Sequence, residues 1–202
     1  MASETPLAKG GNMPSDLALF VGQILRSPKT ISAMAPSSRG LARAITADIG
    51  PNTGAVAEFG PGTGVFTRIL LERGVAPKNL TLFEVNPTFA ATLRVRFPSV
   101  RVINGGAETI GQHCHAVGAV VSGLPLLSFP EALIRAILGG AFSVLRPGAA
   151  MYQFTYGSRS PVPDAIAAEL GLVATPASRR VWLNWPPARV YRLTRAADQP
   201  TD

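Results

Sequence analysis

The feature that most constrains the fold of this chain is a glycine-rich turn, Gly60–Gly64, which directly follows the apolar run of residues 54–59. A helical pattern of apolar residues, including Phe66 and Ile69, continues beyond the turn. Strand, glycine turn and helix in this order are typical of a ligand crevice at the carboxyl end of a parallel strand. Glycines permit positive φ angles and the close approach of a ligand to the backbone.

Two acidic residues flank the turn in positions that favour a nucleoside ligand. Glu58 lies two residues before Gly60, and Glu84 ends the next apolar run, twenty residues after Gly64. A carboxylate at that second strand end can accept hydrogen bonds from both hydroxyls of a ribose. The sequence lacks Gly-Lys-Ser/Thr, so we expect no triphosphate site. The alternative interpretation is a tight turn in an unrelated α/β protein.

The composition is that of a basic protein with one domain. The 202 residues suit a single domain, and 47% of them are hydrophobic, which allows a substantial core. The net charge of +7 favours an anionic partner, such as nucleic acid, a membrane surface or an acidic ligand. The single cysteine, Cys114, excludes a disulfide framework. With only His113 and His115 beside it, we expect no metal site there.

The N-terminal region predicts a basic amphipathic helix ahead of the main domain. Residues 1–13 are small and polar, so we expect them to be disordered and not a signal peptide. Over the helical segment of residues 14–50 no acid occurs between Asp16 and Asp48. A helix over 14–26 is interpreted either as a lid over the ligand or as an interfacial membrane helix. The candidate lipid-contacting residues are Leu17, Phe20, Val21, Ile24, Arg26 and Lys29.

Strand and helix patterns alternate between residues 51 and 195, as expected for a parallel α/β sheet. We predict strands over 54–59, 80–84, 100–103, 117–122 and 149–155, and a closing antiparallel hairpin from 179–183 and 188–193. Helices are predicted over 39–49, 64–73, 87–96, 129–139 and 162–170. Gly139 and Gly140 are expected to end the fourth of these helices, and 145–148 to form a turn. The prediction is a Rossmann-like, mostly parallel sheet of seven strands with a C-terminal tail over 196–202.

Two serines precede the predicted helix over 39–49. Ser37 or Ser38 can cap its N-terminus through a side-chain oxygen. A helix N-terminus with Arg39 nearby is also suited to an anion. Both interpretations stay open.

No apolar run of the chain approaches the roughly 18 residues of a membrane span. We therefore expect a cytoplasmic protein, or one bound peripherally to the cytoplasmic face of the inner membrane.

The combination of Glu58, the three glycines and Glu84 resembles the class I S-adenosylmethionine (AdoMet)-dependent methyltransferases. The resemblance implies AdoMet as cofactor, with Glu58 at the methionine ammonium and Glu84 at the ribose. It also implies that Ala107 and Glu108, after the third strand, lie near the adenine. The cofactor-binding residues expected on this basis are Glu58, Gly60, Pro61, Gly62, Thr63, Gly64, Glu84, Val85, Ala107, Glu108 and Ser122.

The fourth strand ends in Ser122-Gly123-Leu124-Pro125-Leu126, where this class places its substrate-facing loop. Adenine methyltransferases that act on nucleic acid carry Asn or Asp first and an aromatic side chain last, and the base stacks on the aromatic ring. Ser122 and Leu126 occupy those positions here, which counts against a nucleic-acid partner. An apolar lip that includes Leu124 and Pro125 suits a lipid instead.

Several stretches together resemble the bacterial phospholipid N-methyltransferases over about residues 14–195. They are Ser27–Ile31 with Pro36–Ser38, the Glu58 motif, Phe83–Asn86, Ser122–Pro125 and Gln153–Gly157. The resemblance implies N-methylation of phosphatidylethanolamine, stepwise to phosphatidylcholine, by a peripheral membrane enzyme whose N-terminal helix binds anionic lipid. We expect a monomer. Two alternatives stay open: an rRNA adenine N6-methyltransferase-like enzyme and a non-catalytic AdoMet-fold binding protein.

Methyl transfer to a lipid amine requires a neutral nitrogen, whereas such an ammonium has a pKa of roughly 10. The Ser122 loop contains no acid, so the site must desolvate the amine or supply another proton acceptor. The candidates are Tyr152 and Tyr156, which alternate spacing places on one face of the fifth strand, with Ser122 positioning the amine. Structural tyrosines, or proton transfer to the lipid phosphate, are the alternatives.

Overall fold

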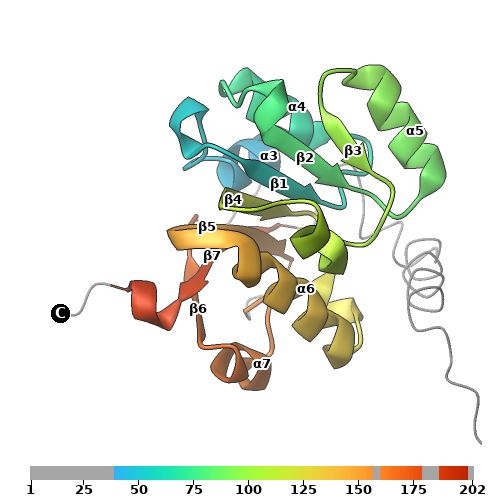
Figure 1. The fold of residues 1–202 in the computed structure, drawn as a ribbon. Helices are drawn as coiled ribbons and strands as arrows, with labels where there is room; N and C mark the ends of the chain where they lie inside the picture. Colours follow the sequence, from blue (N-terminus) through green and yellow to red (C-terminus); the bar gives the residue numbers. More distant parts are fainter. Residues whose placement is uncertain (1–38, 157–159, 179–186, 200–202) are drawn as a thin grey trace, which may run out of the picture.

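The computed structural model describes residues 39–156, 160–178 and 187–199, and a seven-stranded sheet forms its centre (Figure 1). The spatial order of the strands is β3 (Arg101–Ile103), β2 (Leu80–Phe83), β1 (Val56–Phe59), β4 (Val117–Ser122), β5 (Leu145–Thr155), β7 (Arg189–Arg195) and β6 (Leu172–Pro176). Strands β3 to β5 in that order are parallel, and β7 is antiparallel to both of its neighbours. The predicted mostly parallel α/β sheet of seven strands is confirmed.

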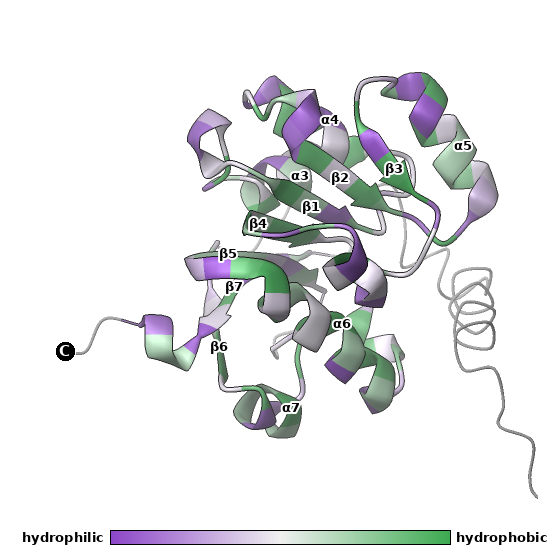
Figure 2. Cartoon of the chain, viewed as in Figure 1, coloured by the Kyte–Doolittle hydropathy of each residue, from purple (hydrophilic) through white to green (hydrophobic). Residues whose placement is uncertain are grey.

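Helices cover both faces of the sheet (Figure 1). One face carries α3 (Arg39–Ile45), α4 (Val65–Glu72) and α5 (Pro87–Arg96), and the other carries α6 (Glu131–Val144) and α7 (Asp164–Glu169). Short 3₁₀ helices lie at Pro51–Thr53, Pro77–Asn79, Ala107–Gln112, Leu126–Ser128 and Ala196–Asp198. Because both faces are covered, the central strands are largely apolar along their length (Figure 2).

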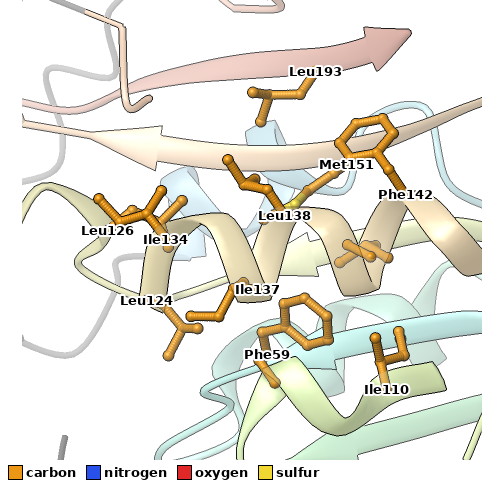
Figure 3. Close-up of a cluster of buried hydrophobic side chains, with 14 of the residues drawn as sticks. Phe59, Ile110, Leu124, Leu126, Ile134, Ile137, Leu138, Phe142, Met151 and Leu193 are labelled. Carbon is orange, nitrogen blue, oxygen red and sulfur yellow. The ribbon is translucent and has the colours of Figure 1, made fainter. Parts of the chain in front are cut away.

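Each face of the sheet has its own apolar cluster. On the α6 face, Phe59, Ile137, Leu138 and Met151 belong to one cluster (Figure 3). On the other face, Leu41 and Ile45 of α3 pack with residues of α4 and α5. Burial of each such side chain contributes roughly 1.5–3 kcal/mol to stability. Helix α3 therefore packs in the same apolar cluster as α4 and α5.

The first 38 residues lie outside the described part of the chain. They include the predicted disordered segment, the amphipathic helix over 14–26 and the proposed cap. The candidate residues concerned are Leu17, Phe20, Val21, Ile24, Arg26, Lys29, Ser37 and Ser38. Within the ranges that the structure does describe, no helix has the length and apolarity needed to cross a membrane.

Helix α6 does not end at the glycine pair, contrary to the prediction. It continues through Gly139 and Gly140 to Val144, because Ala141, Phe142 and Val144 beyond them are buried. A Cβ atom on Gly140 would lie 3.1 Å from the carbonyl oxygen of Glu108. Gly140 therefore permits close packing of α6 on the Ala107–Gln112 helix. The predicted turn over 145–148 is part of β5, whose register with β4 shifts between Val117 and Ala119.

The closing antiparallel pair is present, and the strand that pairs with β7 at the edge of the sheet is β6. Strand β7 pairs with β6, Leu172–Pro176, a segment for which no strand was predicted. The predicted partner over 179–183 lies outside the described residues. Strand β6 was missed because three of its five residues, Val173, Ala174 and Thr175, are only partly buried, so alternation of apolar and polar residues is weak.

Candidate active site

The candidate site lies at the carboxyl ends of β1 and β4, where the direction of strand succession reverses. The chain moves from β1 outward to β3 and then returns to β4 on the other side of β1. In such sheets the loops on either side of the reversal leave a crevice between them, and ligands bind there. The glycine turn follows β1 and the Ser122 loop follows β4, so the two predicted loops meet at this point.

The three glycines of the turn all have positive φ, but they meet different surroundings. A Cβ atom on Gly60 would lie 2.7 Å from Leu124 Cδ2, and one on Gly64 would lie 2.6 Å from Phe97 Cε2. At Gly62 a Cβ atom would meet no atom within 4 Å. Gly60 and Gly64 therefore permit close packing within the protein, whereas Gly62 borders open space that a ligand can occupy.

Two further hydrogen bonds fix the shape of the turn. The backbone N–H of Gly64 donates to the carbonyl oxygen of Pro61 at 2.8 Å. The Arg96 guanidinium, at the end of α5, donates to the carbonyl oxygen of Thr63 at 2.5 Å. The backbone of the turn is thus fixed by one hydrogen bond within the turn and one from helix α5.

Glu58 is fully buried beneath the turn and directed toward α4. Its Oε2 accepts a hydrogen bond of 2.7 Å from the hydroxyl of Thr67. Its Oε1 is buried and finds no partner among the residues that the structure describes. Burial raises the pKa of Glu58 to about 8, against hydrogen bonds from Thr67 that lower it. A cationic ligand group beside Oε1 would satisfy this oxygen and restore the carboxylate.

Glu84 lies at the end of β2 with its carboxylate facing the glycine turn. Oε2 accepts a hydrogen bond of 3.2 Å from Gly62 N, and Oε1 accepts one of 2.9 Å from Asn86 N. The Asn104 side chain donates to the Glu84 backbone carbonyl oxygen at 2.8 Å. Burial raises the pKa of Glu84 above its usual value, and the backbone N–H donors oppose that shift. Glu58 and Glu84 thus flank the turn as the spacing predicted.

The residues predicted to lie near an adenine follow β2 and β3. Val85 packs partly buried against the α6-side cluster, and Ala107 is buried at the start of the Ala107–Gln112 helix. The Glu108 carboxylate lies over Gly106, where an added Cβ would fall 2.1 Å from its Oε1. Val85, Ala107 and Glu108 thus follow the ends of the neighbouring strands β2 and β3.

The loop after β4 packs against the glycine turn and contributes buried neutral polar groups. Gly123 N donates to the carbonyl oxygen of Phe59 at 2.8 Å, and the side chain of Leu124 is buried. Leu124 joins the cluster around Phe59, so it supports the turn and does not form an exposed apolar lip (Figure 3). Pro125 is partly exposed. The Ser122 hydroxyl is buried and accepts a hydrogen bond of 3.3 Å from Leu124 N.

Gln153 is a site residue that sequence reasoning did not assign. It lies beside Ser122 in the β4–β5 register and is only 1% exposed. Its Nε2 donates to the carbonyl oxygens of Leu124 at 2.8 Å and Phe154 at 3.0 Å. The signal in the sequence was an amide side chain between apolar residues of a strand expected to be buried on both faces.

The structure does not bring Tyr152 to the site. Its hydroxyl donates to Asp48 Oδ2 at 3.1 Å, and the two residues line a hollow with Gly118 at the amino end of β4. Burial, and then the Asp48 charge, raise the pKa of Tyr152, which keeps the phenol protonated. The predicted role of proton acceptor is therefore corrected. Tyr156 does share a face with Tyr152, and packs on Phe154 at 5.3 Å between ring centroids.

Over most of its length the chain is similar in sequence to a lipid methyltransferase. An ornithine lipid N-methyltransferase from Singulisphaera acidiphila is 33% identical over 149 residues, which is 69% of this chain and 78% of the relative. The ribosomal RNA small subunit methyltransferase A of Chlorobium chlorochromatii is 44% identical over only 55 residues, or 27% of this chain and 20% of that protein. No protein-family model matches the chain.

A solved structure with the same fold is the 1,6-didemethyltoxoflavin-N1-methyltransferase of Burkholderia thailandensis, in a complex with 1,6-didemethyltoxoflavin and S-adenosylhomocysteine. Its TM-score to this chain is 0.64 at 15% sequence identity, over 95% of this chain and 91% of that one. At this identity the likeness concerns the fold alone.

Proposed function

Because this chain belongs to the class I AdoMet-dependent methyltransferases, we propose that it transfers methyl groups from AdoMet to the amino group of a membrane lipid. The observation that carries the proposal is the 33% identity to an ornithine lipid N-methyltransferase over 78% of that relative's length. The buried neutral lining of the β4–β5 end supports it, because desolvation favours the neutral amine that methyl transfer requires.

The residues at the β1–β2 end fit AdoMet as the cofactor. The unpaired, buried Oε1 of Glu58 suits a cationic group such as the methionine ammonium. The Glu84 carboxylate, which two backbone N–H groups already orient, suits the ribose hydroxyls. The space beside Gly62 allows the ligand to approach the backbone. When bound, AdoMet supplies an electrophilic methyl group on a sulfonium.

The protein contributes position and solvent exclusion to the reaction. The Ser122 loop packs directly on the glycine turn, so the acceptor amine and the cofactor would share one region. Holding two reactants in line within such a region supplies a large part of the acceleration. The Ser122 hydroxyl and backbone carbonyls orient the amine, and its proton leaves to water or to the lipid phosphate before transfer.

For the head group we propose phosphatidylethanolamine, methylated stepwise to phosphatidylcholine. The relative's substrate by name is ornithine lipid, which like phosphatidylethanolamine presents an amine on a membrane surface. The test is competition in vesicles that contain both lipids at equal concentration, with methylated products identified by mass spectrometry. We expect the phosphatidylethanolamine products to dominate. Dominant methylation of ornithine lipid would overturn the head-group assignment and leave lipid N-methylation intact.

We also propose that the protein docks on the cytoplasmic face of the membrane through the segment of residues 14–26. The sequence supports this by its apolar spacing and its excess of cations up to Arg43. Removal of residues 1–25 should abolish sedimentation with anionic vesicles, because it deletes the apolar side chains of Leu17, Phe20, Val21 and Ile24, whose burial contributes roughly 1.5–3 kcal/mol each. Undiminished sedimentation of the truncated, folded protein would refute this docking proposal.

A second candidate is methylation of RNA, which the short match to a ribosomal RNA methyltransferase favours. Ser122 and Leu126 count against it, because adenine methyltransferases that act on nucleic acid carry Asn or Asp and an aromatic ring at these two positions. Transfer of labelled methyl groups to unmodified ribosomal RNA, with no transfer to lipid in parallel, would establish this candidate over the lipid.

A further inference from the structure

The Oε1 atom of Gln153 is a buried hydrogen-bond acceptor that the cofactor chemistry does not use. It finds no partner in residues 39–156, 160–178 and 187–199. Buried polar atoms are nearly always hydrogen-bonded, so an unpaired one next to a ligand site calls for a partner from the ligand. Gln153 lies in β5 beside Ser122, at the carboxyl end of the sheet where the proposed reaction takes place.

The orientation of the Gln153 amide is fixed by its neighbours. Nε2 donates to two backbone carbonyl oxygens, those of Leu124 and Phe154. Rotation of the amide by 180° would set Oε1 against these two acceptors, which is unfavourable because neither side could donate. The free oxygen is therefore held in place by the same contacts that position the amide.

A short chain of contacts connects Gln153 to the cofactor turn. Gln153 binds the carbonyl of Leu124, and the Leu124 side chain occupies the space directly above Gly60. In the same loop Gly123 packs so closely that a Cβ on it would lie 2.8 Å from the Gly60 carbonyl oxygen. The amide is thus attached to the loop that covers the glycine turn, next to the region shared by amine and cofactor.

We propose that Gln153 Oε1 accepts a hydrogen bond from an N–H of the substrate amine and so directs the nitrogen lone pair at the methyl group. This inference rests on the proposed lipid N-methylation. The ammonium first gives its proton to water. The lone pair then forms the N–C bond while the C–S bond of the sulfonium breaks and leaves its electron pair on sulfur. A neutral amide accepts the hydrogen bond but does not take the proton.

With this role, Gln153 would not assist all three successive methyl transfers equally. A neutral primary amine and a neutral monomethylamine each keep an N–H that can bind Oε1 while the lone pair reacts. A neutral dimethylamine has no N–H left. Gln153 therefore assists the first and second transfers and gives no assistance to the third.

The test uses the full chain and three separate substrates: phosphatidylethanolamine and its monomethyl and dimethyl derivatives in mixed micelles. Gln153→Leu should lower kcat/KM about tenfold for the first two lipids, the usual effect of losing one hydrogen bond, and leave that for the dimethylated lipid within about twofold. The inhibition constant of the trimethylated lipid, which has no N–H, should be the same for Gln153→Leu and the wild-type protein. This control measures lipid binding without turnover of that lipid.

Two further variants separate this role from a structural one. Gln153→Glu keeps an acceptor oxygen, and as a buried, protonated acid also a donor toward Leu124, so it should retain the wild-type preference among the lipids. Gln199→Leu removes a matched amide, whose Nε2 donates to Thr194 Oγ1 at 2.6 Å, and should change none of the rates.

Failure of the proposed Gln153 role and failure of the proposed lipid methylation would give different results. An equal fall for all three lipids in Gln153→Leu, or no fall for any, would overturn the acceptor role while lipid methylation stands. A wild-type protein that binds AdoMet but methylates none of the three lipids would overturn the proposed function, and the inference with it.

Discussion

The two halves of the site differ in the kind of polar group that they bury. At the ends of β1 and β2 the buried groups are carboxylates, Glu58 and Glu84. At the ends of β4 and β5 they are neutral, Ser122 and Gln153. Buried carboxylates suit a ligand that carries positive charge and hydroxyls, whereas neutral groups avoid stabilising an ammonium and so favour the free amine. The division matches a cationic cofactor on one side and a nucleophile on the other.

The largest effect that tests this division is expected at Glu58. Glu58→Gln keeps the shape and the contact with Thr67 but removes the charge, so AdoMet affinity measured by calorimetry should fall at least about 100-fold. The exposed carboxylate Glu72 on α4 provides the control, and Glu72→Gln should bind normally. Unchanged AdoMet affinity in Glu58→Gln would contradict the proposed division of charge, because the β1–β2 half of the site would then not need its negative charge.

The same residue predicts a pH dependence of stability. The pKa of Glu58 is about 8 in the folded protein and 4.5 as its ordinary value, so between these values the folded state holds a proton that the unfolded state has lost. This group therefore stabilises the ligand-free protein below about pH 4.5, and its contribution is lost as the pH rises to about 8. Urea unfolding at several pH values should show a decline of a few kcal/mol that Glu58→Gln lacks.

A smaller effect separates packing from ligand space within the glycine turn. Gly64→Ala should destabilise the protein by about 2–4 kcal/mol, because the new Cβ would lie 2.6 Å from Phe97 at a φ of +78°. Gly62→Ala meets no protein atom within 4 Å and should cost only about 1 kcal/mol of backbone strain.

Cofactor binding should respond to these two variants in the opposite order. The Cβ in Gly62→Ala occupies the ligand space, so AdoMet affinity should fall at least about tenfold although the protein stays folded. Thermal unfolding and calorimetry on both variants check the pair. Normal AdoMet binding by Gly62→Ala would show that AdoMet does not occupy the space beside Gly62.

The smallest effect is expected at Tyr152. Tyr152→Phe removes only the hydrogen bond to Asp48, so it should cost about 1 kcal/mol of stability and leave kcat within about twofold. Steady-state methylation of lipid micelles and urea unfolding are the measurements. A fall in kcat of tenfold or more at unchanged AdoMet affinity would restore Tyr152 as a catalytic group and weaken the case for a neutral β4–β5 half.

The position of the two acids beside the glycine turn could be predicted from the sequence because it depends on local spacing. Glycines at fixed spacing and an acid at each strand end are visible without the fold, and Glu58 and Glu84 do flank the turn. The substrate half depends on where side chains point. Tyr152 and Gln153 are adjacent in β5, and only the tertiary contacts show that the Tyr152 hydroxyl meets Asp48 while the Gln153 amide meets the Leu124 loop.

The end of helix α6 was also mispredicted because it depends on a tertiary contact. Glycines usually end helices, yet Gly140 continues α6 because a small residue is needed where the helix meets the carbonyl of Glu108. That contact joins segments far apart in the sequence. Local helix propensity therefore could not reveal this contact. The parallel sheet, by contrast, could be predicted because its strands recur at regular intervals along the sequence.

Lipid N-methylation is tested most directly by transfer of a labelled methyl group from AdoMet to vesicles that contain phosphatidylethanolamine, with the product lipids separated. We expect labelled monomethyl, dimethyl and trimethyl lipids with the wild-type protein, and none with Glu58→Gln at the same AdoMet concentration. Absence of labelled lipid from a wild-type protein that binds AdoMet would contradict the proposed lipid N-methylation.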